Sequence, residues 1–335
     1  MGKILQGSAD VKLTECKFCA STDIVKNGSW YGTQRWLCRN CGRAFVDNKA
    51  LPKMKHPVDM VANALSMYFR GMSERQITNH FKQQYGYAPN RATIYRWVQK
   101  MAKIAIDEAY NHTPEVGDTW VADETNLFIG GDRYWLFDII DTKTRFLLAT
   151  RLTPTRSIDD VRVLVEKAAQ RAGKPPKTIR TDSMSSYEDG IELAFGSETK
   201  HVKTKGLTAE INTNIIERWH GTLKDRIKVL RGFKQVPSAL TIIEGWLTHY
   251  NFFRPHESLN DRTPAQAAGI TAQFQNWADV VQSQKGIIGK PEAYKVAVPK
   301  QVIMSKVKPT RKRRHKIPKS KISPKPKQKE IRINR

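Results

Sequence analysis

The change of hydrophobic periodicity after Gly117 constrains the fold more than any other feature of the sequence. Three β-rich runs follow at 120–129, 133–141 and 145–152, joined by Gly130–Gly131 and by Thr142–Lys143. Short runs rich in β-branched and aromatic residues, with turn residues between them, are typical of hairpin-connected strands. The sequence therefore predicts an antiparallel meander of three strands.

Beyond the meander the pattern alternates between helix and strand. Helices are expected at 158–168, 187–195, 212–229 and 239–251, and strands at 177–181 and 200–203. Three antiparallel strands followed by such alternation predict an α/β fold, a mixed sheet with helices on both faces. This order of elements is the ribonuclease H-like arrangement.

All four cysteines lie near the N-terminus in two Cys-x-x-Cys pairs, Cys16/Cys19 and Cys38/Cys41, with the eighteen residues 20–37 between them. Disulfides between them are not expected, because a reducing compartment does not keep thiols oxidised. The spacing is instead typical of a four-cysteine zinc ribbon. We expect one structural Zn²⁺ held by all four, in a small domain of short strands with a hairpin turn at 26–28.

A second N-terminal region shows three amphipathic helices. The first opens after His56–Pro57, the second carries a Ser73/Gln76 capping box, and the third starts near Asn90. A cationic third helix is typical of a helix-turn-helix, whose last helix enters a DNA major groove. A plain helical linker with a solvated basic face is the alternative. The candidate DNA-contacting residues are Arg91, Thr93, Arg96, Gln99 and Lys100.

The charge of the chain predicts a polyanionic partner. Lys and Arg number 57 against 32 Asp and Glu, a formal net charge of +25. Fourteen of the cations fall in 306–335 against Glu330 alone, among prolines and few large apolar residues. Such a segment cannot bury enough apolar surface to fold, so we predict a disordered basic tail that contacts nucleic acid, with a solubilising tail as the alternative.

Membrane insertion is not expected. No apolar run reaches the length of a membrane span, and residues 1–10 lack the order of a signal peptide. The prediction is a cytoplasmic, nucleoid-associated protein.

Three carboxylates stand where a metal site could be built. Asp123 lies within the first expected strand, Asp182 ends the fourth, and Glu217 lies early in a long helix, 34 residues after Asp182. Lys224 lies two turns further along that helix. Hard oxygen donors from a strand centre, a strand end and a helix suit two Mg²⁺ or Mn²⁺ ions per active site, which activate and cleave phosphodiesters.

Other carboxylates compete with this set. Asp138 and Asp141 also lie on or beside strands, but Asp141 reads as a turn residue. Glu124 is expected to point to the strand face opposite Asp123, and Glu210 to be a charge at a helix start.

The order of these motifs resembles the insertion-sequence DDE transposases of the integrase superfamily. The resemblance covers roughly 16–270 and rests on Trp120-x-x-Asp123-Glu124-Thr125, Thr181-Asp182-Ser183, Asn214-x-x-Glu217-Arg218, Tyr250–His256 and Thr263–Pro264. It implies that Asp123, Asp182 and Glu217 are the catalytic metal-binding acids and that Lys224 contacts DNA.

The resemblance also implies an activity. The enzyme would bind the ends of an insertion sequence, cut their 3′ ends by metal-dependent hydrolysis, and join them to target double-stranded DNA by transesterification. Because two ends join in one event, at least a homodimer is expected. Two alternatives remain open: a catalytically silent DNA-binding regulator, and a structure-selective nuclease of the same fold.

These expectations divide the chain into five parts. They are a zinc ribbon (1–50), a helix-turn-helix domain (51–112), a ribonuclease H-like DDE catalytic domain (113–270), a C-terminal extension (271–304) and the basic tail (305–335).

Overall fold

The computed structural model describes residues 15–30, 33–48, 50–51, 54–182, 184–203 and 214–286. All of them fall within the first of two compact units, Met1–Glu292. The expected basic tail and most of the expected C-terminal extension lie outside the described residues. No helix in the described part of the chain is both long enough and apolar enough to cross a membrane.

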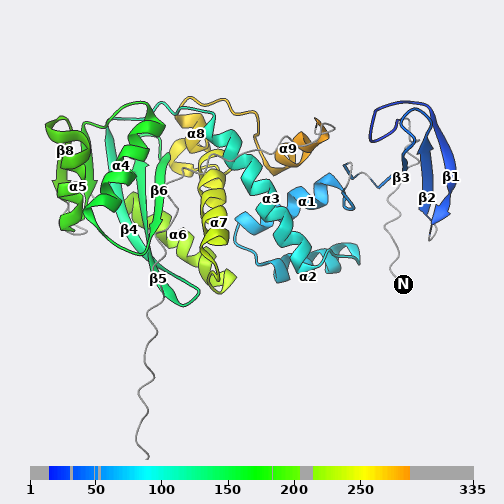
Figure 1. Ribbon diagram of the computed structural model, residues 1–335, viewed down its shortest axis with the longest axis horizontal. Coiled ribbons are helices and arrows are strands. Elements are labelled where there is room, and N and C mark those ends of the chain that lie inside the picture. The colour runs from blue at the N-terminus through cyan, green and yellow to red at the C-terminus, as the bar shows by residue number, and fades with distance from the viewer. Residues whose placement is uncertain are drawn as a thin grey trace, which may run out of the picture. The chain divides into compact units, whose positions relative to one another are not determined.

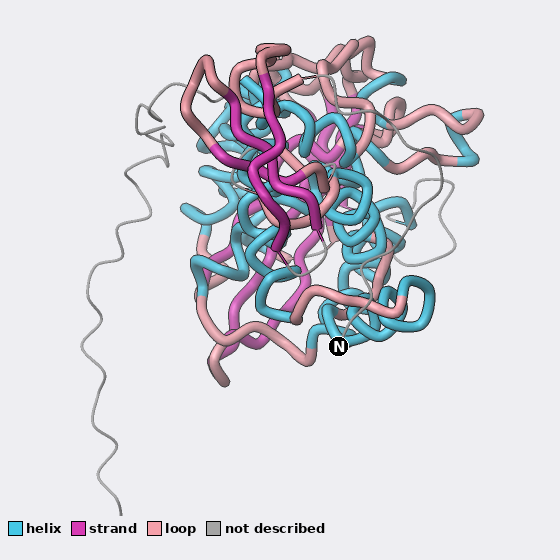
Figure 2. Tube along the Cα trace, turned by 90° about the vertical axis from the view of Figure 1, so that its right-hand side faces the viewer, coloured by secondary structure: helices cyan, strands magenta, loops and turns pink. Residues whose placement is uncertain are grey.

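The N-terminal strands form a three-stranded antiparallel sheet, drawn in magenta facing the viewer in Figure 2. Its strands are β1 (Ile24–Trp30), β2 (Thr33–Cys38) and β3 (Ala44–Val46). The expected turn at 26–28 is wrong, because Gly28 lies inside β1. There it adopts a φ of +68° at a shift of register between Lys26 and Ser29. A left-handed glycine of this kind is typical of a β-bulge rather than of a chain reversal.

Three helices follow, as expected: α1 (Val58–Phe69), α2 (Glu74–Tyr85) and α3 (Arg91–Tyr110). The capping box at the start of α2 is confirmed, since Ser73 Oγ accepts from the Gln76 backbone N–H and Gln76 Oε1 accepts from the Ser73 backbone N–H. Asn90 caps α3 by accepting from the Thr93 backbone N–H. Gly86 ends α2 in the left-handed conformation.

The central sheet has five strands in the order β6-β5-β4-β7-β8 (Figure 1). The strands are β4 (Thr119–Ile129), β5 (Asp132–Asp141), β6 (Leu147–Thr153), β7 (Thr178–Thr181) and β8 (Lys200–Lys203). The first three pair antiparallel as a meander, and β7 and β8 run parallel to β4. The predicted mixed sheet of ribonuclease H-like order is therefore confirmed.

Helices cover both faces of this sheet. They are α4 (Ile158–Ala172), α5 (Ser185–Phe195), α6 (Asn214–Leu230) and α7 (Val236–Thr248). Two short helices follow in the chain, α8 (Pro264–Ala267) and α9 (Trp277–Gln282). Side chains alternate across the strands. Trp120, Ala122 and Phe137 share a core with α4 and α5, whereas Val121 and Leu136 share one with α6 and α7. Even-numbered residues of β4 therefore face α4 and α5, and odd-numbered residues face α6 and α7.

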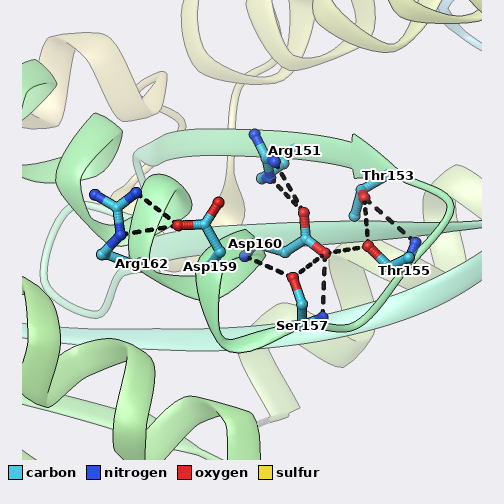
Figure 3. A network of polar contacts seen from close by, with 7 residues as sticks. All are labelled: Arg151, Thr153, Thr155, Ser157, Asp159, Asp160 and Arg162. Carbon is cyan, nitrogen blue, oxygen red and sulfur yellow. Dashed lines mark hydrogen bonds and ion pairs between the residues drawn. The ribbon is translucent and has the colours of Figure 1, made fainter. Parts of the chain in front are cut away.

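The corner between β6 and α4 is held by one buried carboxylate, Asp160 (Figure 3). It accepts hydrogen bonds from Arg151 at the end of β6, from Thr155, and from both the backbone and the hydroxyl of the N-cap residue Ser157. These bonds lower the pKa of Asp160 although burial opposes the shift. The crossover helix is therefore anchored where it leaves the sheet.

The three helices after the ribbon share a core with the central sheet and its helices. α3 packs on α7, and α1 packs on α9. A Cβ added to Gly245 of α7 would lie 3.0 Å from the Cβ of Ala102 on α3, so this glycine permits the close approach. Phe69 stacks on Trp277 and on His249, which belongs to a short π-helix (His249–Phe253) continuing α7.

Candidate active site and cysteine cluster

Asp123 and Asp182 lie at the same end of neighbouring parallel strands. β4 pairs with β7 through Val121, two residues before Asp123, and β7 ends at Thr181, one residue before Asp182. Because parallel strands end at one edge of the sheet, the two side chains meet there. Their carboxylate oxygens belong to a group whose ligand atoms all lie within 4.8 Å of one another.

The third member of this group is Glu124 rather than Glu217. Glu124 has the parity of the α5 face, as expected, and accepts from the Tyr187 hydroxyl of α5 at 3.1 Å and from Arg156 at 3.3 Å. Its carboxylate nevertheless comes close to Asp182. β7 has already ended at this level, so the longer Glu side chain can pass the open edge of β4. The alternation of side chains along β4 correctly predicted which face of the sheet Glu124 lies on. It did not predict that its carboxylate comes close to Asp182.

The electrostatics of the group are those of crowded anions. Burial and the nearby charge of Asp182 raise the pKa of Glu124 above its ordinary value. Burial, followed by the charge of Glu124, raises the pKa of Tyr187 well above the usual range, so its hydroxyl stays a hydrogen-bond donor. A cation placed among these carboxylates would relieve the repulsion.

Glu217 and Lys224 lie on exposed positions of α6, Glu217 in its first turn. Between them, His220 projects into the sheet and its Nδ1 lies 3.3 Å from Asp123 Oδ2. Residues three and four apart on a helix are neighbours. Glu217 and Lys224 are therefore one turn before and one turn after the residue that contacts Asp123, on the same stripe of α6.

His220 is a functional candidate that sequence reasoning missed, and its partner is Asp138, which the sequence presented only as a competing carboxylate. Asp138 is fully buried on β5, directly opposite Asp123, and its Oδ2 accepts from His220 Nε2 at 3.0 Å and from Trp219 Nε1 at 2.8 Å. Burial alone would lower the pKa of His220, but its bonds to the two aspartates raise it to about 9. The protonated ring thus fastens α6 to the strand that carries Asp123. The Trp219–His220 pair, two and three residues after Glu217, was the available signal.

The donor set at this edge fits a hard divalent cation. Mg²⁺ binds a few carboxylates together with water and substrate phosphate, and carboxylate oxygens are the only ligand atoms that the group offers. The arrangement could hold metal ions against a phosphodiester.

The four cysteines form a second ligand group, as predicted. Cys16 Sγ lies 3.8 Å from Cys41 Sγ, and Cys19 Sγ lies 3.6 Å from Cys38 Sγ. Four sulfurs about 2.3 Å from a tetrahedral Zn²⁺ would be separated by roughly 3.8 Å. All four thiols are free, so the geometry suits a closed zinc site rather than disulfides.

The candidate DNA-contacting residues of α3 differ in availability. Arg91, Arg96 and Lys100 are exposed. Thr93 is half-buried and its hydroxyl lies 3.4 Å from the capping Asn90 Oδ1, whereas Gln99 Nε2 donates to the Tyr95 hydroxyl at 3.3 Å. Of the five candidates, the three cationic side chains are therefore the ones most available to DNA.

Comparison with known proteins gives a consistent family. Residues 117–256 match the DDE domain family DDE_Tnp_IS240. The transposase for insertion sequence-like element IS431mec of Staphylococcus aureus strain Mu50 is 26% identical over 190 residues, which are 56% of this chain and 82% of that protein. The transposase for IS257 in transposon Tn4003 of Staphylococcus aureus matches with the same identity and coverage.

Among solved structures, the HTLV-2 integrase catalytic core in complex with magnesium aligns with 47% of this chain and 97% of its own, at 19% identity and a TM-score of 0.37. The DDE domain spans both strands and the helix that bear Asp123, Asp182 and Glu217, and the Staphylococcus relatives are matched over most of their length. Residues 117–256 therefore match a DDE domain, and the chain is similar to insertion-sequence transposases of Staphylococcus aureus.

Proposed function

We propose that this chain is an insertion-sequence DDE transposase that cuts the 3′ ends of its element and joins them to target DNA at Asp123, Asp182 and Glu217. The observation that carries the proposal is the meeting of Asp123 and Asp182 at one sheet edge, with α6 fastened to Asp123 through His220. Glu217 lies one helical turn from that contact. Glu124, held by Tyr187 and Arg156, is a neighbouring anion that tunes the site.

Two steps would share this site. In the first, a water oxygen attacks phosphorus at the element end, the bond to the 3′ oxygen breaks, and a 3′-hydroxyl and a 5′-phosphate result. In the second, that 3′ oxygen attacks a target phosphorus and displaces the target's own 3′ oxygen, which takes up a proton. The number of phosphodiesters is conserved in the second step, so no energy source is needed. Two Mg²⁺ or Mn²⁺ ions held by the three acids would activate the attacking oxygen and stabilise the leaving one.

The N-terminal parts would supply recognition. We assign reading of the element end to α3, through Arg91, Arg96 and Lys100, with Thr93 and Gln99 at its flank, and backbone contact beside the active site to Lys224. The cysteine cluster would hold one structural Zn²⁺. The division at 50, 112, 270 and 304 is part of this proposal, as is assembly of at least two copies on paired ends.

The test uses the full chain on labelled duplexes that carry the element ends flanking the gene. Asp123→Asn, Asp182→Asn and Glu217→Gln should each lower Mg²⁺-dependent strand cleavage and strand transfer by orders of magnitude while end binding persists. Glu192→Gln, which removes an exposed carboxylate from α5, is the matched control and should keep full activity.

Each alternative predicts a different result. Binding of the ends without any cleavage by the wild type, in either metal, would indicate a silent regulator. Cleavage without joining would indicate a nuclease. If Glu124→Gln abolished cleavage and Glu217→Gln did not, the third ligand would be Glu124.

A further inference from the structure

A small cationic cavity lies on the flank of α6 opposite to Glu217 and has no role in the mechanism above. It measures about 130 Å³, and its walls come from α6, from the turn between β5 and β6, and from the segment that follows α7. Trp219 and Tyr250 form its aromatic sides. Four basic residues line it: Arg145, Arg218, Arg254 and His256.

The lining of the cavity itself supplies no neutralising charge, because no carboxylate is among the described residues that form it. Three guanidinium groups from three separate elements line it, and like charges repel one another. Such convergence is what an anion-binding site requires, because only a bound anion makes it favourable.

Two strained or unsatisfied groups point the same way. Arg145 adopts a φ of +61°, a left-handed conformation that is unusual for an arginine and presents its side chain at the turn. His256 Nε2 is buried without a hydrogen-bond partner in the described structure, and its ring lies 4.5 Å from the Tyr250 ring. This ring nitrogen can pair with an anion only as an N–H, and an anion in the cavity would favour its protonation.

The size of the cavity limits the ligand to one small group. Pockets for nucleotide-sized ligands measure roughly 300–1,000 Å³. A phosphate group fits the volume, and arginine is the residue best suited to it, since its planar donors match phosphate oxygens.

Helix α6 places the cavity relative to the acids. Ile215, Arg218 and Thr222 form one stripe of α6 that faces the cavity, on the flank opposite to the stripe of Glu217, His220 and Lys224. Trp219 lines the cavity and also donates to Asp138, which lies opposite Asp123 on β5. The cavity and the acids therefore lie on the two flanks of the same helix.

We propose that this cavity binds one backbone phosphate of the DNA held by the protein, on the flank of α6 opposite to the acids. The proposal rests on the function proposed above, and the phosphate could belong either to the element end or to the target DNA.

The test measures binding of the full chain to an element-end duplex over a range of salt concentrations without divalent metal. Arg254→Gln should weaken binding and lower the slope of log K against log salt by about 0.9, the value of one phosphate contact. Arg254→Lys should restore the slope. Arg162→Gln removes the same charge from α4, where the arginine pairs with Asp159 and Glu166, and should change neither quantity. Arg218→Gln, at an exposed position, provides a second variant should Arg254→Gln fold poorly.

Single neutral methylphosphonates then identify the phosphate. At one position of the DNA backbone, the neutral substitution should weaken binding by the wild type but should not weaken binding by Arg254→Gln any further. The alternative result is that the substitutions leave binding to the element end unchanged. If a methylphosphonate in the target DNA then lowers strand transfer by the wild type but not further by Arg254→Gln, the phosphate belongs to the target. Full additivity at every position of both DNAs would overturn the proposal. Because binding is read without metal, this outcome is separate from failure of the wild type to cleave, which would overturn the proposed function.

Discussion

Acid should weaken the packing of α1, α7 and α9 through one buried histidine, His249. Its side chain is 4% exposed, stacks against Phe69 and Trp277, and accepts a hydrogen bond from Trp277 Nε1 on Nδ1 at 3.3 Å. That bond requires the neutral ring. Burial, together with the charges of Arg70, Arg254 and Arg226, lowers the pKa of His249 to about 3.

The sign follows from proton binding in the two states. The pKa of the ring is about 6.5 in the unfolded chain and about 3 in the folded protein, so the folded ring stays neutral down to about pH 3. Stability from the neutral ring is therefore fully present above pH 6.5 and is lost as the pH falls between these values. Between pH 7 and pH 5 the loss amounts to about 2 kcal/mol, at about 1.4 kcal/mol per pH unit below the unfolded pKa.

The assay compares the wild type with His249→Phe by urea unfolding at pH 7 and pH 5 and constant ionic strength. The variant keeps an aromatic ring but leaves the Trp277 N–H without its acceptor, a cost that does not depend on pH. His256, whose pKa is also lowered, titrates in both proteins and cancels in the comparison. The wild type should lose about 2 kcal/mol more than the variant between the two pH values. Equal losses would show that His249 is not the group that titrates.

Four further outcomes are expected. Elemental analysis should find about one zinc per chain, and chelation should unfold the N-terminal sheet while the circular dichroism of the remaining chain persists; freely reactive thiols in a metal-free, folded protein would contradict this. Arg96→Ala should cost about 1–3 kcal/mol on the element end and little on random DNA in filter binding, whereas equal losses would assign it to a phosphate. Asp160→Ala should lower the free energy of unfolding in urea by about 2 kcal/mol or more, since it removes the acceptor that anchors α4. Asp138→Asn should cost about 3–5 kcal/mol in the same measurement, because it leaves protonated His220 beside one carboxylate fewer, and an unchanged midpoint would refute the ion pair.

The sheet could be predicted from the sequence because its strands are short apolar runs between clear turn signals. β4 and β5 start within a residue of their expected positions around Gly130–Gly131, and β8 coincides with 200–203. The starts of helices could be predicted where the sequence has a capping residue, as at Ser73 and Asn90. Asp123 and Asp182 could be paired because adjacent parallel strands end at one edge.

What escaped prediction depends on contacts between distant positions or on small departures from regular geometry. The bond between Asp138 and His220 joins residues 82 positions apart, and no local pattern sets which side chains meet across a helix and a sheet. The bulge at Gly28 looks like a turn in sequence, because both use a left-handed glycine. The carboxylate of Glu124 comes near Asp182 only because β7 stops one residue short of it.

Helix α3 spans twenty residues, or about 30 Å along its axis. The exposed cations Arg91, Arg96 and Lys100 lie in the first half, and Ala102 in the second half is packed against Gly245 of α7. One continuous helix therefore joins the surface proposed to read DNA to the core that holds the acids. It would fix both the distance and the relative rotation between them. One residue inserted between Gln99 and Ala102 would turn the cationic end by about 100° and advance it by about 1.5 Å. The cleavage position along the DNA would then depend on the length of this helix as much as on any base contact.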